Sequence, residues 1–112
     1  MEVKFTTQGK TLIAAVTGEL DQHCAASLRE QTDLRISHTN IKRLIFDLSS
    51  LEFMDSSGIG VIIGRYKLLR SIGGSVSVVT GRQSVKKLLE LSGIGKIMDI
   101  CESVTDAERR AM

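Results

Sequence analysis

Apolar and polar positions alternate at the start of the chain, in "VKFTTQGKTLIAAVTGEL". Two alternating runs flank a Gln8-Gly9 turn, and their apolar members are Val3, Phe5, Leu12, Ala14 and Val16. Alternation on both sides of a glycine-containing turn is typical of two paired strands with one buried face. The pattern therefore predicts a β-hairpin that ends near Gly18.

Helical periodicity marks two longer segments. Asp21 is a plausible N-cap for a weakly amphipathic helix that extends to about residue 37. A second helix follows "FMDSS", and the Gly73-Gly74 pair ends it. Its apolar residues recur at three- and four-residue steps, as a core-facing stripe does, and they are Ile59, Ile62, Ile63, Tyr66 and Leu69.

Shorter segments complete the pattern. The apolar run "RLIFDLSS" predicts a strand that is covered on at least one face, and "SVSVV" predicts another. "VKKLLELSG" predicts a helix with Val85, Leu88 and Leu89 inward and Gly93 at its C-terminal cap. A short strand at "KIMDI" and a terminal helix at "SVTDAERRAM" follow.

This order of elements predicts an α/β fold. Strands and helices alternate after the hairpin, which indicates a mixed sheet of about four to five strands with crossover helices, about four in number. No proline or low-complexity segment marks a linker, so residues 1–112 are expected to form a single domain. Loops 18–21 and 54–57 each join a strand end to a helix start, and such loops form the functional edge of open α/β sheets.

Composition excludes several classes of function. The sequence has no apolar run long enough to span a membrane and no signal-peptide core at its start, so we expect a cytoplasmic protein without membrane contact. A net charge of +2 and 4% aromatic residues argue against nucleic-acid binding. Cys24 and Cys101 match no metal-ligand spacing, and we expect reduced, buried thiols, with no metal and no other cofactor.

Charge is distributed unevenly along the chain. Acidic residues lie in or beside the two loops, whereas basic residues are concentrated after residue 64. The acidic set consists of Glu19, Asp21, Asp47, Glu52 and Asp55. If the two loops meet in space, they form an acidic rim around the adjacent serines Ser56 and Ser57.

Three roles compete for these serines. As an N-cap, a serine hydroxyl accepts a hydrogen bond from a free helix N–H, and Ser57 is the better placed, which leaves the Ser56 hydroxyl unassigned. A catalytic serine is disfavoured, because "DSSGIG" is not the G-x-S-x-G motif and, although His23 could come close if the two loops meet, the sequence gives no independent sign of an orienting acid or an oxyanion hole. Neither "GIG" sequence completes a phosphate-binding glycine motif.

The third role is phosphorylation of Ser56. A phosphate adds about −1.5 to −2 charge at neutral pH, and a helix N-terminus tolerates it. Beside Asp21 and Asp55 the added charge would oppose a docked partner, because like charges forced together across an interface cost several kcal/mol. Gly58 and Gly60 lack side chains and would allow a partner's backbone to approach closely.

The stretch "LEFMDSSGIGVIIGRYKLLRSIGG", with "TGELDQHCA" before it and "VKKLLELSGIGKI" after it, closely resembles the anti-sigma factor antagonists of the STAS domain family. The likeness extends to about Ile100. It implies the STAS fold and a protein that is not an enzyme. In that family the dephosphorylated antagonist binds an anti-sigma factor that is also a serine kinase, and a sigma factor is freed. The kinase phosphorylates the first serine of the D-S-S-G motif, here Ser56, and a serine phosphatase resets the switch.

The resemblance also implies an interface. Asp21 would face an arginine of the kinase, and the free antagonist would be a monomer. The expected contact residues are Leu20, Asp21, Met54, Asp55, Ser57, Gly58 and Gly60. "GRYK" favours the sporulation branch, whereas "TGRQS" and Gly95 depart from it, so a general stress-response antagonist stays open. A constitutive interaction module is a separate alternative.

Overall fold

The structure is a computed structural model, which describes residues 1–110. In chain order the elements are β1 (Glu2–Gln8), β2 (Thr11–Leu20), α1 (Ala25–His38), β3 (Arg43–Leu48), β4 (Leu51–Met54), α2 (Ser56–Ser71), β5 (Ser75–Thr80), α3 (Gln83–Leu91), the 3-10 turn η1 (Ile94–Lys96), β6 (Asp99–Cys101) and α4 (Val104–Arg110). The predicted α/β architecture is confirmed.

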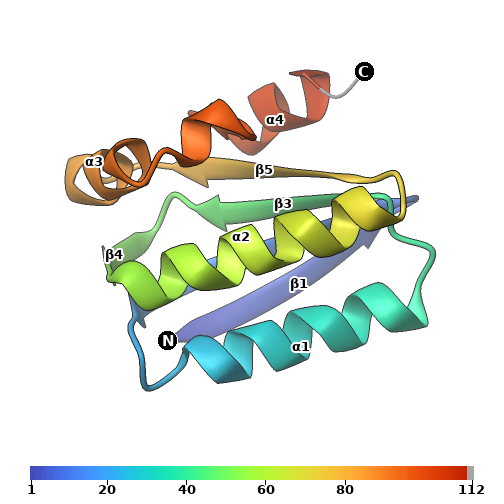
Figure 1. Cartoon of the computed structure of the whole chain (residues 1–112), viewed down its shortest axis with the longest axis horizontal. Helices are drawn as coiled ribbons and strands as arrows, with labels where there is room; N and C mark the ends of the chain where they lie inside the picture. Colours follow the sequence, from blue (N-terminus) through green and yellow to red (C-terminus); the bar gives the residue numbers. More distant parts are fainter. Residues whose placement is uncertain (111–112) are drawn as a thin grey trace.

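One mixed sheet organises the domain, with strand order β1-β2-β3-β5-β6. β1 and β2 form the predicted antiparallel hairpin, and the other pairs are parallel. β4 lies off this path and pairs in parallel with the last residues of β2. The parallel strands therefore end at one edge of the sheet, and the helices that follow them start there (Figure 1).

The main core lies between the sheet and the layer of α1, α2 and α3. α1 and α2 run side by side across the sheet (Figure 1). Alternate residues of β3 and β5 face the two sides, because side chains alternate along a strand. Phe46 and Val78 enter the main core, whereas Ile45 and Val79 form a smaller cluster with Ala107 of α4.

The predicted apolar stripe of α2 faces this core. Ile59, Ile62 and Leu69 are buried, and Ile63 and Tyr66 pack against them in part. Gly73 and Gly93 follow the ends of α2 and α3, as expected. Cys101 is buried and Cys24 half-buried, and both are free thiols. The predicted inward positions of β2, which are Leu12, Ala14 and Val16, are fully buried.

Two expectations about the elements were wrong. α1 begins at Ala25, not at Asp21, because the Asp21 carbonyl accepts from the N–H groups of Cys24 and Ala25 at 3.2 and 3.0 Å and holds a turn before the helix. The sheet has six strands rather than four to five, because residues 51–54 form β4. The terminal helix is confirmed to Arg110, and the predicted positions 111–112 lie outside the described residues.

No helix within residues 1–110 is long and apolar enough to cross a membrane.

Candidate functional site

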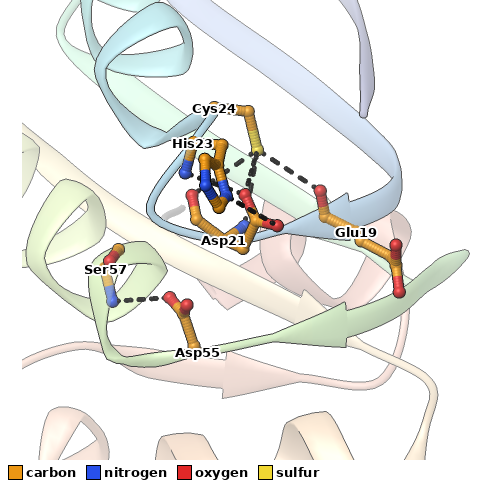
Figure 2. Close-up of polar contacts among 6 residues, drawn as sticks. All are labelled: Glu19, Asp21, His23, Cys24, Asp55 and Ser57. Carbon is orange, nitrogen blue, oxygen red and sulfur yellow. Dashed lines mark hydrogen bonds and ion pairs between the residues drawn. The ribbon is translucent and has the colours of Figure 1, made fainter.

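The two acidic loops meet at the edge of the sheet where β2 and β4 end. Leu20 pairs with Met54, and the Asp55 N–H donates to the Leu20 carbonyl at 3.2 Å. The loop that leads to α1 and the start of α2 therefore lie side by side (Figure 2). The expectation that loops 18–21 and 54–57 share one edge is confirmed.

Asp55 is the N-cap of α2. Its Oδ1 accepts a hydrogen bond from the Ser57 N–H at 2.8 Å (Figure 2). Its carbonyl accepts from the Gly58 N–H at 3.1 Å. The prediction that Ser57 caps this helix was wrong. Asp55 has extended backbone angles, as N-caps do, whereas both serines already lie inside the helix.

Ser56 is the first residue of α2, and its side chain is exposed. Among residues 1–110 its hydroxyl takes part in no hydrogen bond, and Ser57 beside it is half-buried. The capping function that the sequence assigned to one serine is therefore carried by a carboxylate. The Ser56 hydroxyl is free, as expected, although for a different reason.

The Asp21 loop is held by its own polar groups. Asp21 Oδ1 accepts from the His23 N–H at 2.9 Å, and this bond is the main reason that the pKa of the Asp21 carboxyl lies below its ordinary value of 3.8. Cys24 Sγ donates to the Glu19 carbonyl at 3.3 Å and accepts from the Asp21 N–H at 3.4 Å (Figure 2). Asp21 is thus a fixed, ionised carboxylate at neutral pH.

Three of the expected contact residues are buried. Leu20 is fully buried, Met54 is 6% exposed, and Gly58 packs against both of them. A Cβ on Gly58 would lie 2.5 Å from Met54 Cγ and 3.0 Å from Leu20 Cδ2. The expectation that these three contact a partner directly is therefore corrected. They form a buried layer that supports the loops, because Gly58 lets α2 approach them closely.

The other expected residues are accessible. Gly60 is exposed, and a Cβ placed on it would meet no atom within 4 Å. Asp21, Asp55 and Ser57 are half-buried at the same edge. The exposed residues Glu19 and Glu52 extend the acidic rim. Asp47 is different, because its Oδ1 accepts from the N–H and hydroxyl of Ser49 at 3.1 and 2.6 Å and so stabilises the turn between β3 and β4.

The edge does not resemble a hydrolytic site. The His23 side chain is 82% exposed, its Nδ1 lies 3.6 Å from Asp21 Oδ2, and within residues 1–110 no hydrogen bond joins it to Ser56 or Ser57. No cluster of His, Cys, Asp or Glu among these residues could hold a metal ion. The arrangement offers an accessible hydroxyl, ordered backbone and negative charge, which suit modification and docking.

The chain matches the family model described as the STAS domain over residues 2–107. It is 37% identical over 107 residues to the anti-sigma F factor antagonist of Paenibacillus polymyxa, which covers 96% of this chain and 92% of that protein. It is 30% identical over 93 residues to the anti-sigma-B factor antagonist of Bacillus subtilis (strain 168), with 76% of each chain covered.

Solved structures agree with this assignment. The anti-sigma factor antagonist SpoIIAA in its unphosphorylated form superposes with a TM-score of 0.83 at 26% identity, covering 99% of this chain and 98% of that one. The Bacillus cell fate determinant SpoIIAA in the phosphorylated form gives a TM-score of 0.76 at 25% identity, covering 99% and 100%. The family match and these superpositions show that the chain belongs to the STAS domain family and is similar to its anti-sigma factor antagonists.

Proposed function

We propose that this protein is a phosphorylation-switched anti-sigma factor antagonist. Its unphosphorylated form binds an anti-sigma factor that is also a serine kinase, and a sigma factor is released. The kinase then phosphorylates Ser56 and the complex dissociates. The observation that carries this proposal is the free, exposed hydroxyl of Ser56 at the start of α2, on an acidic edge where Asp55 already caps the helix.

The phosphate would leave the domain itself intact. The dipole of α2 favours an anion at its N-terminus, so the folded domain accommodates the charge even though Asp55 already accepts from the Ser57 N–H. No catalytic group is needed in this chain, because a kinase supplies the base, magnesium and nucleotide. We therefore assign it no enzymatic activity and no cofactor.

The same phosphate would act strongly on a partner. It would raise the negative charge of a surface that already carries Asp21 and Asp55, both half-buried there. Like charges brought together at an interface cost several kcal/mol, and each 1.4 kcal/mol is a factor of ten in affinity. One phosphate on Ser56 can thus switch binding off.

Contact and support are divided between two sets of residues. Asp21, Asp55, Ser57 and Gly60 would contact the anti-sigma factor, with Asp21 facing an arginine of the kinase. The buried residues Leu20, Met54 and Gly58 would hold that surface in shape.

We assign the sporulation branch, in which the sigma factor is sigma-F. The supporting observation is the higher identity to the anti-sigma F factor antagonist, 37% against 30% for the anti-sigma-B factor antagonist. In this role the free protein is a cytoplasmic monomer, and a serine phosphatase regenerates it. A genomic neighbourhood that encodes an anti-sigma kinase and a sigma factor of the stress-response type would contradict the branch.

Phosphorylation in vitro tests the switch. The purified protein is incubated with its cognate anti-sigma factor and ATP, and the product is mapped by mass spectrometry, with Ser57→Ala as the matched control. We expect one phosphate on Ser56 in both proteins, whereas phosphate on Ser57 alone, or none, would refute the assignment. Ser56→Ala should bind persistently and Ser56→Asp weakly, and equal affinities of the two would indicate a constitutive interaction module.

A further inference from the structure

A β-bulge lies at the junction of β2 and β4, next to the start of α2. Gly18 pairs with Leu51 and Glu19 pairs with Phe53, so the register shifts by one residue and Glu52 is the extra residue of β4. Gly18, which lies opposite Leu51 on β2, has φ of +84°, a backbone conformation that side-chain-bearing residues rarely adopt. Bulges occur often next to functional sites, where they change the direction of a side chain.

This bulge changes the direction of Phe53. In a regular strand, side chains two residues apart share a face, so Phe53 would point inward with the fully buried Leu51. Instead Glu52 and Phe53 are both exposed between the buried residues Leu51 and Met54. Phe53 is 47% exposed and is a member of neither of the two buried clusters. Its exposure thus follows from a specific backbone feature and not from a loose surface.

Two acidic residues and the proposed phosphorylation site lie close to Phe53 in the strand register and along the chain. Glu19 lies opposite it in the strand register, Glu52 precedes it, and Ser56 follows three residues later. Interfaces place aromatic anchors in desolvated pockets and surround them with polar groups, and a few such anchors carry most of the binding energy. An exposed phenylalanine within an acidic rim has this composition.

We infer that Phe53 is the apolar anchor of the contact with the anti-sigma factor, and that it enters an apolar pocket rimmed by arginine or lysine side chains. This inference rests on the proposed function and adds a partner-binding residue to it. The charge of the rim selects a basic surface on the partner, because the exposed residues Glu19 and Glu52, which lie opposite and next to Phe53, need opposite charges when the interface closes. A phosphate on Ser56 would then act on the same anchored surface.

Other exposed apolar side chains provide a control. Leu34 is 57% exposed and lines a groove with Leu68 and Ile72, in the C-terminal parts of α1 and α2. Because the acidic edge lies at the N-terminal ends of these helices, Leu34 is an apolar residue of similar exposure at the other end of the molecule.

The test measures affinity for the purified cognate anti-sigma factor by isothermal titration calorimetry, with unphosphorylated wild type, Phe53→Ala, Phe53→Leu and Leu34→Ala. We expect Phe53→Ala to bind about ten- to thirty-fold more weakly, Phe53→Leu to retain most of the affinity, and Leu34→Ala to equal wild type. Phe53→Ala should raise the KM for phosphorylation of Ser56 and leave kcat unchanged, since the reacting hydroxyl is untouched.

Circular dichroism and thermal unfolding establish that the variants are folded, and Phe53→Glu is a second variant in case Phe53→Ala is not. Phe53→Glu adds a like charge to the acidic rim, and we expect it to abolish binding. Wild-type affinity in either folded variant would overturn the inference while leaving the switch at Ser56 in place. A wild-type protein that fails to bind the anti-sigma factor would overturn the proposed function, and the inference with it.

Discussion

The contact of Gly58 with the buried loops leads to a prediction about Gly58→Ala. The new methyl carbon would lie 2.5 Å from Met54 Cγ, 2.7 Å from Met54 Sδ and 3.0 Å from Leu20 Cδ2. Carbon atoms in close-packed interiors stay about 3.5–4.0 Å apart. Met54 and Leu20 are themselves buried, so they can move away only by displacing other parts of the core. Gly58→Ala therefore overpacks the junction of β2, β4 and α2.

The magnitude follows from comparison with Gly60, which lies two residues further along the same helix. Replacement of glycine by alanine inside a helix stabilises it by about 1 kcal/mol, and both substitutions gain this amount. Overpacking of a core costs about 1–3 kcal/mol, and only Gly58→Ala incurs it, because a Cβ on Gly60 meets no atom within 4 Å. We expect Gly60→Ala to stabilise the protein and Gly58→Ala to be less stable than Gly60→Ala by about 1–3 kcal/mol.

Urea denaturation of wild type and both variants, followed by circular dichroism, measures this difference. The midpoint concentrations should differ while the denaturant slope m stays the same, since neither change alters the surface exposed on unfolding. Equal midpoints for Gly58→Ala and Gly60→Ala would refute the reasoning. That result would mean that Met54 and Leu20 rearrange without cost, and that the loops are not held by close packing.

Three further predictions concern the same edge and the thiols. Asp55→Ala should lower the free energy of unfolding by about 1 kcal/mol, measured by denaturant titration, because α2 loses its N-cap. The Asp21 carboxyl should titrate below pH 3.8 by NMR; its bond to the His23 N–H stabilises the fold fully above that pH and is lost as pH falls through the lowered pKa. Ellman's reagent should label Cys24 in the native protein and Cys101 only on unfolding, because Cys101 is buried and burial raises the pKa of its thiol.

The sequence predicted the elements that have a clear period. The alternation before and after Gln8-Gly9 indicates the hairpin, and the three- and four-residue spacing from Ile59 to Leu69 indicates α2 and its buried face. It did not predict β4, because a four-residue strand is too short to show alternation and the bulge at Glu52 breaks the period that remains. The exposure of Phe53 was missed for the same reason, since a register shift depends on the pairing partner and not on local pattern.

The sequence predicted where the candidate site lies, but not which of its residues are buried and which are accessible. That the loops meet follows from a general property of parallel sheets, so Asp21 and Ser56 could be placed on one edge from sequence. Which of two nearby residues caps a helix is decided by backbone angles, and both Asp55 and Ser57 are good capping residues by type. The burial of Leu20, Met54 and Gly58 depends on contacts between three separate elements, which no single segment encodes.

The division of the site into a buried layer (Leu20, Met54 and Gly58) and accessible residues separates two kinds of loss of function. We expect a substitution in the buried layer, such as Gly58→Ala, to weaken the proposed partner binding by disturbing the fold, so that affinity and stability fall together. A substitution at the accessible residue Gly60 can instead change binding and stability in opposite directions. If a partner's backbone lies against Gly60, Gly60→Ala should make the protein more stable and yet bind the anti-sigma factor more weakly, because the added methyl fills space that is empty in the free protein. An unchanged affinity in this stabilised variant would mean that the partner does not approach α2 at Gly60, and contact would then be restricted to the loops and to the first residues of the helix.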